Sequence, residues 1–197
     1  MSLQRSVQPP ATAEALAALR AAVEEVAEKS LCAYTEPCDR ARFLEAWRAT
    51  LPAPSEPAAV PSEPVSTLLP GAVGADVWYC TSVMFHGPFS GDVGIVLTRT
   101  LTLELYCSFA GMTLEENPSE AEVRDFAAEF ANVVCGHWLT RTYTHLKFDL
   151  DAPVVDVLLP EPEGPQTSWS DMAAHLFICV NDVPIQVTFA PRAQRIA

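Results

Sequence analysis

The chain has 197 residues, a formal net charge of −13 and a sequence pI of about 4.6. Nearly half of the residues are apolar, which argues against global disorder and is enough for one compact domain with a sizeable core. The acidic balance argues against nonspecific binding to nucleic acid or to an anionic membrane, because both need an excess of Lys and Arg.

Cysteine and histidine spacing predicts neither a disulfide framework nor a metal site. No two cysteines have CxxC spacing, and most lie within apolar runs, where a free thiol behaves as a small hydrophobe. We expect reduced core cysteines, with a disulfide framework as the less favoured alternative. HxxxH and HExxH spacings are absent among the four histidines, which are His86, His137, His145 and His175.

The first residues carry no basic segment followed by an apolar run. No stretch approaches the roughly 18 apolar residues of a membrane span. We therefore expect a cytoplasmic protein.

Two helices are expected in the first quarter of the chain. Residues 12–30 are Ala-rich and amphipathic, and residues 39–50 form a shorter pattern with Asp39 as a plausible N-cap. Residues 51–71 then carry six prolines, a composition that favours an extended connector inserted over the surface. A peptide-like docking segment is the alternative for this stretch.

The middle of the chain predicts a hairpin followed by an ambiguous segment. Residues 77–86 and 93–98 are expected to pair as antiparallel strands joined by the GPFSGD turn. Residues 101–105 alternate like a strand, but apolar residues from 101 to 112 also recur at helical spacing. Gly111 suits a helix C-cap and favours the helix.

The best-signalled helix is expected from 117 to about 140. Asn117 is a suitable N-cap, Pro118 fits the first helical position and Glu120 the third, as in a capping box. An apolar face then follows at helical spacing, formed by Phe126, Phe130, Val134 and Trp138.

A stripe of polar and small residues lies beside this apolar face. Its members are three and four residues apart and span roughly 80° around the axis; they are Glu122, Asp125, Glu129, Asn132 and Gly136. Small or apolar residues flank it on the far side: Ala121, Ala128, Cys135 and Leu139. Because the stripe ends in an amide and a glycine, it indicates a surface that another molecule can approach closely.

The last third of the chain predicts further extended segments. Residues 145–150 and 154–159 are expected as short strands, and 160–170 as a loop. Residues 174–180 and 183–189 alternate around Asn181-Asp182 and predict a hairpin. The pattern as a whole predicts an α/β (α+β) layer fold, an antiparallel sheet of hairpins packed with long helices. We expect one domain over 1–197, with its core at about 75–190 plus the helix at 12–30.

Three features resemble the CheC/CheX/FliY family of chemotaxis phosphatases. They are the FHGPFSGDVGIVLT hairpin, the ExxN motif Glu129-Phe130-Ala131-Asn132 with Gly136 one turn on, and the C-terminal hairpin. The ExxN motif occurs once, which resembles CheX rather than CheC with its two tandem motifs. The likeness covers roughly residues 75 to 190, and the 12–30 helix fits the family's first helix.

The resemblance implies hydrolysis of the aspartyl phosphate on a CheY-like receiver domain. Asn132 would hold an attacking water, and Glu129 would pair with a lysine of the receiver. The receiver would supply the phosphoaspartate and Mg²⁺, so no cofactor or metal of the chain's own is expected. The resemblance also implies a homodimer, and we expect no nucleic-acid or membrane partner.

This assignment agrees with the chemistry of the two side chains. In-line phosphoryl transfer asks for positioning and charge stabilisation rather than a strong nucleophile. An amide can donate to and accept from a water while staying neutral beside a dianion. Gly136 has no side chain and would let the partner approach the helix closely. His137 is expected to be a packed histidine rather than a catalytic base. Arg124 and Arg141 are candidates to offset the acidic charge locally.

Three alternatives remain at this stage. Glu129 and Asn132 could be an ordinary exposed pair on an amphipathic helix. The chain could instead be a receiver-binding adaptor without catalysis, or a signalling scaffold like those of flagellar switches. An adaptor would need Glu129 more than Asn132, whereas a phosphatase would need both.

Overall fold

The computed structural model describes residues 12–51, 77–116, 118–158, 161, 163–165 and 173–192. Its helices are α1 (Thr12–Ser30), α2 (Arg40–Ala49), α3 (Arg99–Ala110), η1 (Leu114–Glu116) and α4 (Glu120–Thr142). Its strands are β1 (Thr35–Pro37), β2 (Trp78–His86), β3 (Ser90–Thr98), β4 (Asp149–Leu150), β5 (Val154–Leu158), β6 (Ala174–Val180) and β7 (Val183–Arg192). This mixture of helices and antiparallel strands confirms the predicted fold class.

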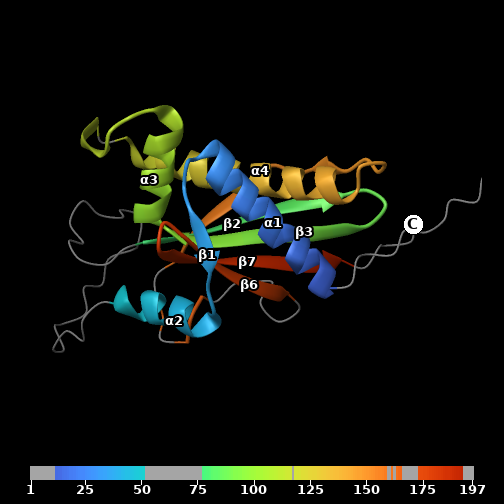
Figure 1. The fold of residues 1–197 in the computed structure, drawn as a ribbon, viewed down its shortest axis with the longest axis horizontal. Helices are drawn as coiled ribbons and strands as arrows, with labels where there is room; N and C mark the ends of the chain where they lie inside the picture. Colours follow the sequence, from blue (N-terminus) through green and yellow to red (C-terminus); the bar gives the residue numbers. More distant parts are fainter. Residues whose placement is uncertain are drawn as a thin grey trace, which may run out of the picture.

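The described strands form one antiparallel sheet in the order β1-β6-β7-β3-β2-β4, with β5 also paired to β2. Helices α1, α3 and α4 cover one face of it, and α2 lies on the other (Figure 1). Alternation along β2 explains the two layers, because Tyr79 packs in the cluster under α1 and α4 while Trp78 and Cys80 pack against α2.

Several elements confirm the sequence predictions. Helix α1 has the predicted bounds, and Asp39 caps α2 by accepting from the Arg42 backbone N–H at 2.8 Å. Strands β2 and β3 pair antiparallel, and the ambiguous segment is helix α3, closed by Gly111 with φ of 65°. The Pro-rich stretch at 51–71 lies outside the described residues, apart from Leu51.

The predicted start of the central helix was wrong. Ser119, rather than Asn117, is the N-cap of α4, so Pro118 precedes the helix. The capping box joins Ser119 to Glu122, since the Ser119 hydroxyl accepts from the Glu122 N–H at 3.3 Å and the Glu122 carboxylate accepts from the Ser119 N–H at 2.8 Å. Glu120 instead contacts a side chain of β2 and one of α3.

The strand boundaries also differ from those predicted. Strand β3 begins at Ser90, inside the predicted GPFSGD turn, and β7 continues to Arg192. Of the predicted 145–150 strand, only Asp149–Leu150 pairs with β2. The predicted hairpin turn at Asn181-Asp182 is confirmed, with φ of 48° and 65° at its two residues, as a two-residue primed turn requires.

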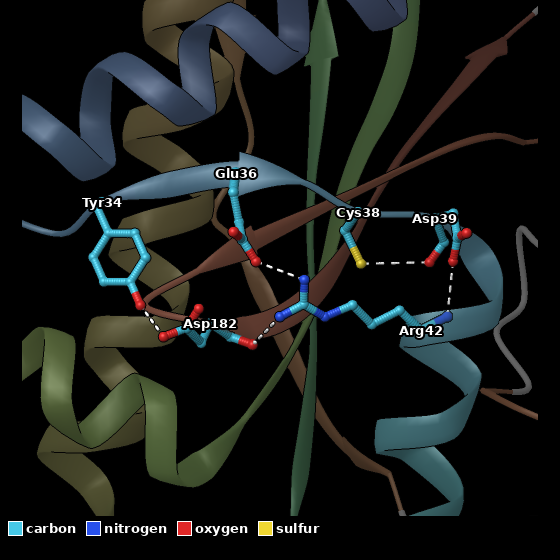
Figure 2. Close-up of polar contacts among 6 residues, drawn as sticks. All are labelled: Tyr34, Glu36, Cys38, Asp39, Arg42 and Asp182. Atoms are coloured by element: carbon cyan, nitrogen blue, oxygen red, sulfur yellow. Dashed lines mark hydrogen bonds and ion pairs between the residues drawn. The ribbon is translucent and has the colours of Figure 1, made fainter.

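Strand β1 was missed because three residues ending in proline carry no periodic signal. It follows the sheet edge between α1 and α2, where a polar network ties it to the β6–β7 turn (Figure 2). Arg42 joins Glu36 at 2.6 Å and donates to the Asp182 carbonyl at 3.3 Å. The Tyr34 hydroxyl donates to the Asp182 carboxylate, which raises the pKa of Tyr34 to about 12.

Candidate functional site

Helix α4 carries the predicted site residues and is anchored to the sheet by its apolar face. The four predicted core residues are all buried, and so are Cys135 and Leu139, which were expected only to flank the stripe. Trp138 makes edge-to-face ring contacts with Phe85 and Phe189, at centroid distances of 5.6 and 5.3 Å. This packing fixes which side of α4 faces solvent.

The first turn of α4 is held by a polar network with β2 and α3. Glu120 accepts a hydrogen bond from the Tyr79 hydroxyl and pairs with Arg99 Nε at 2.6 Å. Burial, followed by the hydrogen bond to Glu120, raises the pKa of Tyr79. The hydrogen bonds from Ser119 lower the pKa of Glu122. Glu122, a member of the stripe, is therefore bound to the helix cap.

The C-terminal half of α4 is tied to α1 through Glu25. His137 Nε2 lies 3.1 Å from the Glu25 carboxylate, and Arg141 also pairs with it. Lys29 of α1 is a further partner of this carboxylate, at 2.6 Å. His137 is thus half-buried between two helices and turned away from the exposed side of α4.

Arg124 ties α4 to the opposite neighbour, the edge strand β5. Its guanidinium donates to the main-chain oxygen of Val155. Arg124 and Arg141, which the sequence suggested as cations for a partner, therefore both have partners within the chain. The two ties lie on opposite flanks of α4 and hold its rotation from both sides.

Glu129 and Asn132 meet on the solvent side of α4. Glu129 is exposed and Asn132 is half-buried. The Asn132 amide donates to the Glu129 carboxylate with Nδ2 and Oε2 3.4 Å apart. Asp125 is exposed on the same side one turn earlier. The structure therefore brings together the two residues of the ExxN motif.

The stripe ends in a hollow that the sequence did not predict. We call it the Gly136 hollow; it has a volume of about 290 Å³ and is lined by Gly136, Leu139, Thr140, Leu146, Lys147, Phe148, Asp149 and Leu150. A Cβ on Gly136 would meet only Leu150 Cδ2, at 3.9 Å. Packing within the chain therefore does not demand glycine there. A sequence signal was lacking because the far wall comes from the irregular segment before β4.

Known proteins resemble this chain in sequence over its middle part and in fold over most of its length. The family model described as chemotaxis phosphatase CheX matches residues 79–157, which include the β2–β3 hairpin and the ExxN motif. Over these residues the chain is similar to the CheC/CheX/FliY family. The model that matches is the one for CheX. No curated protein matches the chain.

Solved structures share the fold at low sequence identity. A CheX from Vibrio vulnificus is 15% identical, with 93% of this chain and 100% of that chain covered at a TM-score of 0.56. A CheC-like superfamily protein from a Shewanella species is 14% identical, with the same coverage and TM-score. A CheX from Desulfovibrio desulfuricans is 12% identical, with 91% and 99% covered at a TM-score of 0.53.

The part of the chain that the structure describes offers neither a metal site nor a membrane span. Its residues contain no cluster of His, Cys, Asp and Glu that could hold a metal ion, and none of its helices is long and apolar enough to cross a membrane. All six cysteines are free thiols, and four of them are buried. A CheX-like chain of this kind therefore offers the ExxN face of α4 as its candidate site.

Proposed function

We propose that this protein hydrolyses the aspartyl phosphate of a CheY-like receiver domain, with Glu129 and Asn132 entering the receiver's phosphorylation site. One observation carries the proposal: in a chain of the CheX-like family, the two ExxN side chains touch on the exposed side of a helix that is tied down on both flanks. A preorganised pair of this kind suits a reaction that depends on positioning.

Asn132 has the role of orienting the attacking water. Its amide oxygen accepts one hydrogen of the water while the oxygen of the water faces the phosphorus. The reaction breaks the bond between phosphorus and the aspartyl oxygen, and it yields free aspartate and inorganic phosphate. The receiver supplies the Mg²⁺ that neutralises charge on the phosphoryl oxygens.

Glu129 has the role of pairing with the receiver's lysine. In the free chain its carboxylate accepts from the Asn132 amide. A lysine ammonium is a stronger partner for a carboxylate than a neutral amide, because both groups are charged. Docking would therefore replace the Glu129–Asn132 contact and leave the Asn132 side chain free to turn its amide oxygen toward the water.

The test is the rate at which a phosphorylated CheY-like receiver loses phosphate in Mg²⁺. The receivers of the source organism are labelled with acetyl phosphate and followed with and without this protein. We expect wild type to accelerate the decay and Asn132→Ala to abolish the acceleration, by about 10² or more, as for other preorganised hydrogen-bonding groups. Asp125→Asn, on the same face one turn earlier, is the matched control and should keep the rate within about twofold.

Equal decay rates for wild type and Asn132→Ala against every receiver would refute the enzymatic role. Receiver binding that needs Glu129 but not Asn132, without acceleration, would favour the adaptor instead. Failure to bind any receiver would favour the scaffold. The homodimer that the family resemblance implies stays a prediction, which light scattering on the purified protein tests directly.

A further inference from the structure

Two cysteines from distant parts of the chain meet where β1 runs into α2. Glu36 of β1 pairs with Cys179 of β6, and Cys38 follows Glu36 by two residues, in the link before α2. Side chains two residues apart in an extended segment point to the same face, so both thiols lie on the α2 side of the sheet. The Cys179 thiol is in hydrogen-bonding contact with the Cys38 thiol. The two sulfurs are therefore neighbours.

The two thiols differ in their access to solvent. Cys179 is fully buried, whereas Cys38 is only half-buried. Burial, followed by the hydrogen bond with Cys38, raises the pKa of Cys179 to about 12. The Cys38 thiol donates to the Asp39 carbonyl at 3.4 Å, in the link where β1 has ended and α2 has not begun (Figure 2). A reagent in solvent therefore meets Cys38 first.

Arg42 and Glu36 are the charged groups that act on this pair of thiols. The Arg42 guanidinium joins Glu36 at 2.6 Å (Figure 2). The hydrogen bond with Glu36, followed by the nearness of Cys179, raises the pKa of Arg42. At Cys179 burial dominates the pKa, while the Arg42 cation opposes it and the Glu36 carboxylate adds to it. Cys179 therefore carries little thiolate at neutral pH until its proton is taken by a neighbouring group.

The link between β1 and α2 allows the two sulfurs to join. Diagonal neighbours on adjacent strands lie slightly further apart than a disulfide allows, so bond formation needs a small movement of the backbone. Cys38 lies beyond the paired register, which ends where Pro37 meets Ile178, so this movement breaks no sheet pair. In the sheet that the structure describes, β1 is an edge strand that pairs only with β6. A bond from Cys38 to Cys179 would hold this short strand in place.

We propose that Cys38 and Cys179 form a dithiol that hydrogen peroxide oxidises reversibly to a disulfide, which fastens the edge strand β1 to β6. In the first step the Cys38 sulfur attacks one peroxide oxygen, the O–O bond breaks, and Cys38 becomes a sulfenic acid as water leaves. In the second step the Cys179 sulfur attacks the Cys38 sulfur, the S–O bond breaks, and the hydroxide leaves with the Cys179 proton as water. The two thiols give two electrons to one peroxide, and a dithiol reductant returns them.

Peptide mapping of the full chain without reductant tests the dithiol. Reduced protein is treated with hydrogen peroxide, the remaining thiols are blocked, and the digest is analysed by mass spectrometry before and after reduction. We expect a pair of peptides joined through Cys38 and Cys179 that separates on reduction. Cys32→Ser is the matched control and should keep the link, because Cys32 is exposed but does not belong to the pair.

Two further variants separate the roles of the thiols. Cys179→Ala removes the second thiol and should leave a sulfenic acid at Cys38, which dimedone labels. Cys38→Ser should abolish the link and leave Cys179 unlabelled. Circular dichroism of both variants checks the fold. Because a cross-link between distant residues restricts the unfolded chain, the oxidised wild type should have a Tm about 5 °C or more above that of the reduced form.

Each outcome supports or overturns the proposal. Folded wild type that gives no joined peptides with peroxide, or that joins Cys38 to Cys32 instead, would overturn it. An equal yield of the link in urea would do the same, because the native contact would then contribute nothing. Dimedone label at Cys179 in Cys38→Ser would refute the order of attack, and a lower Tm in the linked form would refute the fastening of β1. None of these readouts involves a receiver, so the phosphatase proposal is decided separately.

Discussion

Asn132 donates to Glu129 across one turn of α4, with Nδ2 and Oε2 3.4 Å apart. This separation is at the long end for a hydrogen bond, so the contact is weak and a better partner for either group displaces it readily. Both side chains therefore lie together in the free protein and remain available to a partner.

Asn132→Asp tests whether the amide must be neutral. The substitution keeps the size of the side chain but adds a negative charge beside Glu129 and beside an incoming phosphoryl group. We expect phosphate release from the receiver to fall by about 10² or more, as with Asn132→Ala. The single-turnover decay of labelled receiver measures it. Retention of wild-type acceleration would mean that Asn132 does not face the phosphoryl group.

Glu129→Gln tests the charge pair with the receiver's lysine. The amide keeps the shape but loses the ionic part of the contact, which is worth roughly 1.5–3 kcal/mol, or about tenfold to a hundredfold in affinity. Titration with beryllofluoride-activated receiver measures this loss. A double-mutant cycle with the receiver's lysine changed to alanine supplies the control, and additive effects would argue against the pair.

Arg124→Met tests the tie between α4 and β5. Methionine keeps much of the apolar stem but removes the donor to the Val155 oxygen. We expect a loss of about 1–2 kcal/mol in the free energy of unfolding, measured by urea denaturation. Arg48→Met on α2 should change it by less than about 0.5 kcal/mol. Equal losses in Arg124→Met and Arg48→Met would show that the hydrogen bond to Val155 adds nothing to the free energy of unfolding.

Ser119→Ala tests the corrected N-cap. Loss of a serine cap costs about 1 kcal/mol of stability. The hydrogen bonds from Ser119 lower the pKa of Glu122, so their electrostatic contribution is present above the unfolded-state pKa, near 4.5, and is lost as pH falls through the folded-state pKa. The difference between wild type and Ser119→Ala should therefore shrink below about pH 4. A stability difference between wild type and Ser119→Ala that grows at low pH would contradict the assignment of Ser119 as the N-cap partner of Glu122.

The thiols should differ sharply in their reactivity with a thiol reagent at neutral pH. Burial raises the pKa of Cys80 and of Cys135 to about 12, so neither forms thiolate readily. Cys32 is exposed and should be modified first. Mass spectrometry of the modified peptides identifies the site. Cys32→Ser should remove the fastest phase, and a fast phase that persists would contradict the prediction.

Much of the candidate site could be predicted from sequence because it is local to one helix. The ExxN spacing places Glu129 and Asn132 on one side of α4 whatever else the chain does. Helical periodicity likewise predicted α1 and α4, and the Asn181-Asp182 pair predicted the β6–β7 turn. These features depend on backbone geometry and on residues within one turn or one hairpin of each other.

Sequence alone could not supply the features that depend on distant residues. The capping box of Ser119 and Glu122 is local, but Glu120, which the sequence assigned to the cap, is held by the distant residues Tyr79 and Arg99. Strand β1 exists because β6 offers it a partner, although its three residues carry no signal of their own.

What the sequence determined by itself was the main helices and hairpins, the ExxN pair and the resemblance to a family of phosphatases. What only the tertiary structure decided was which cations remain available to a partner and where the surface is hollow. Arg124 and Arg141 are paired with Val155 and Glu25, whereas Lys147 lines the Gly136 hollow. The physical reason is that side-chain spacing is set by the local backbone, while partners and cavities are set by packing between segments far apart in the chain.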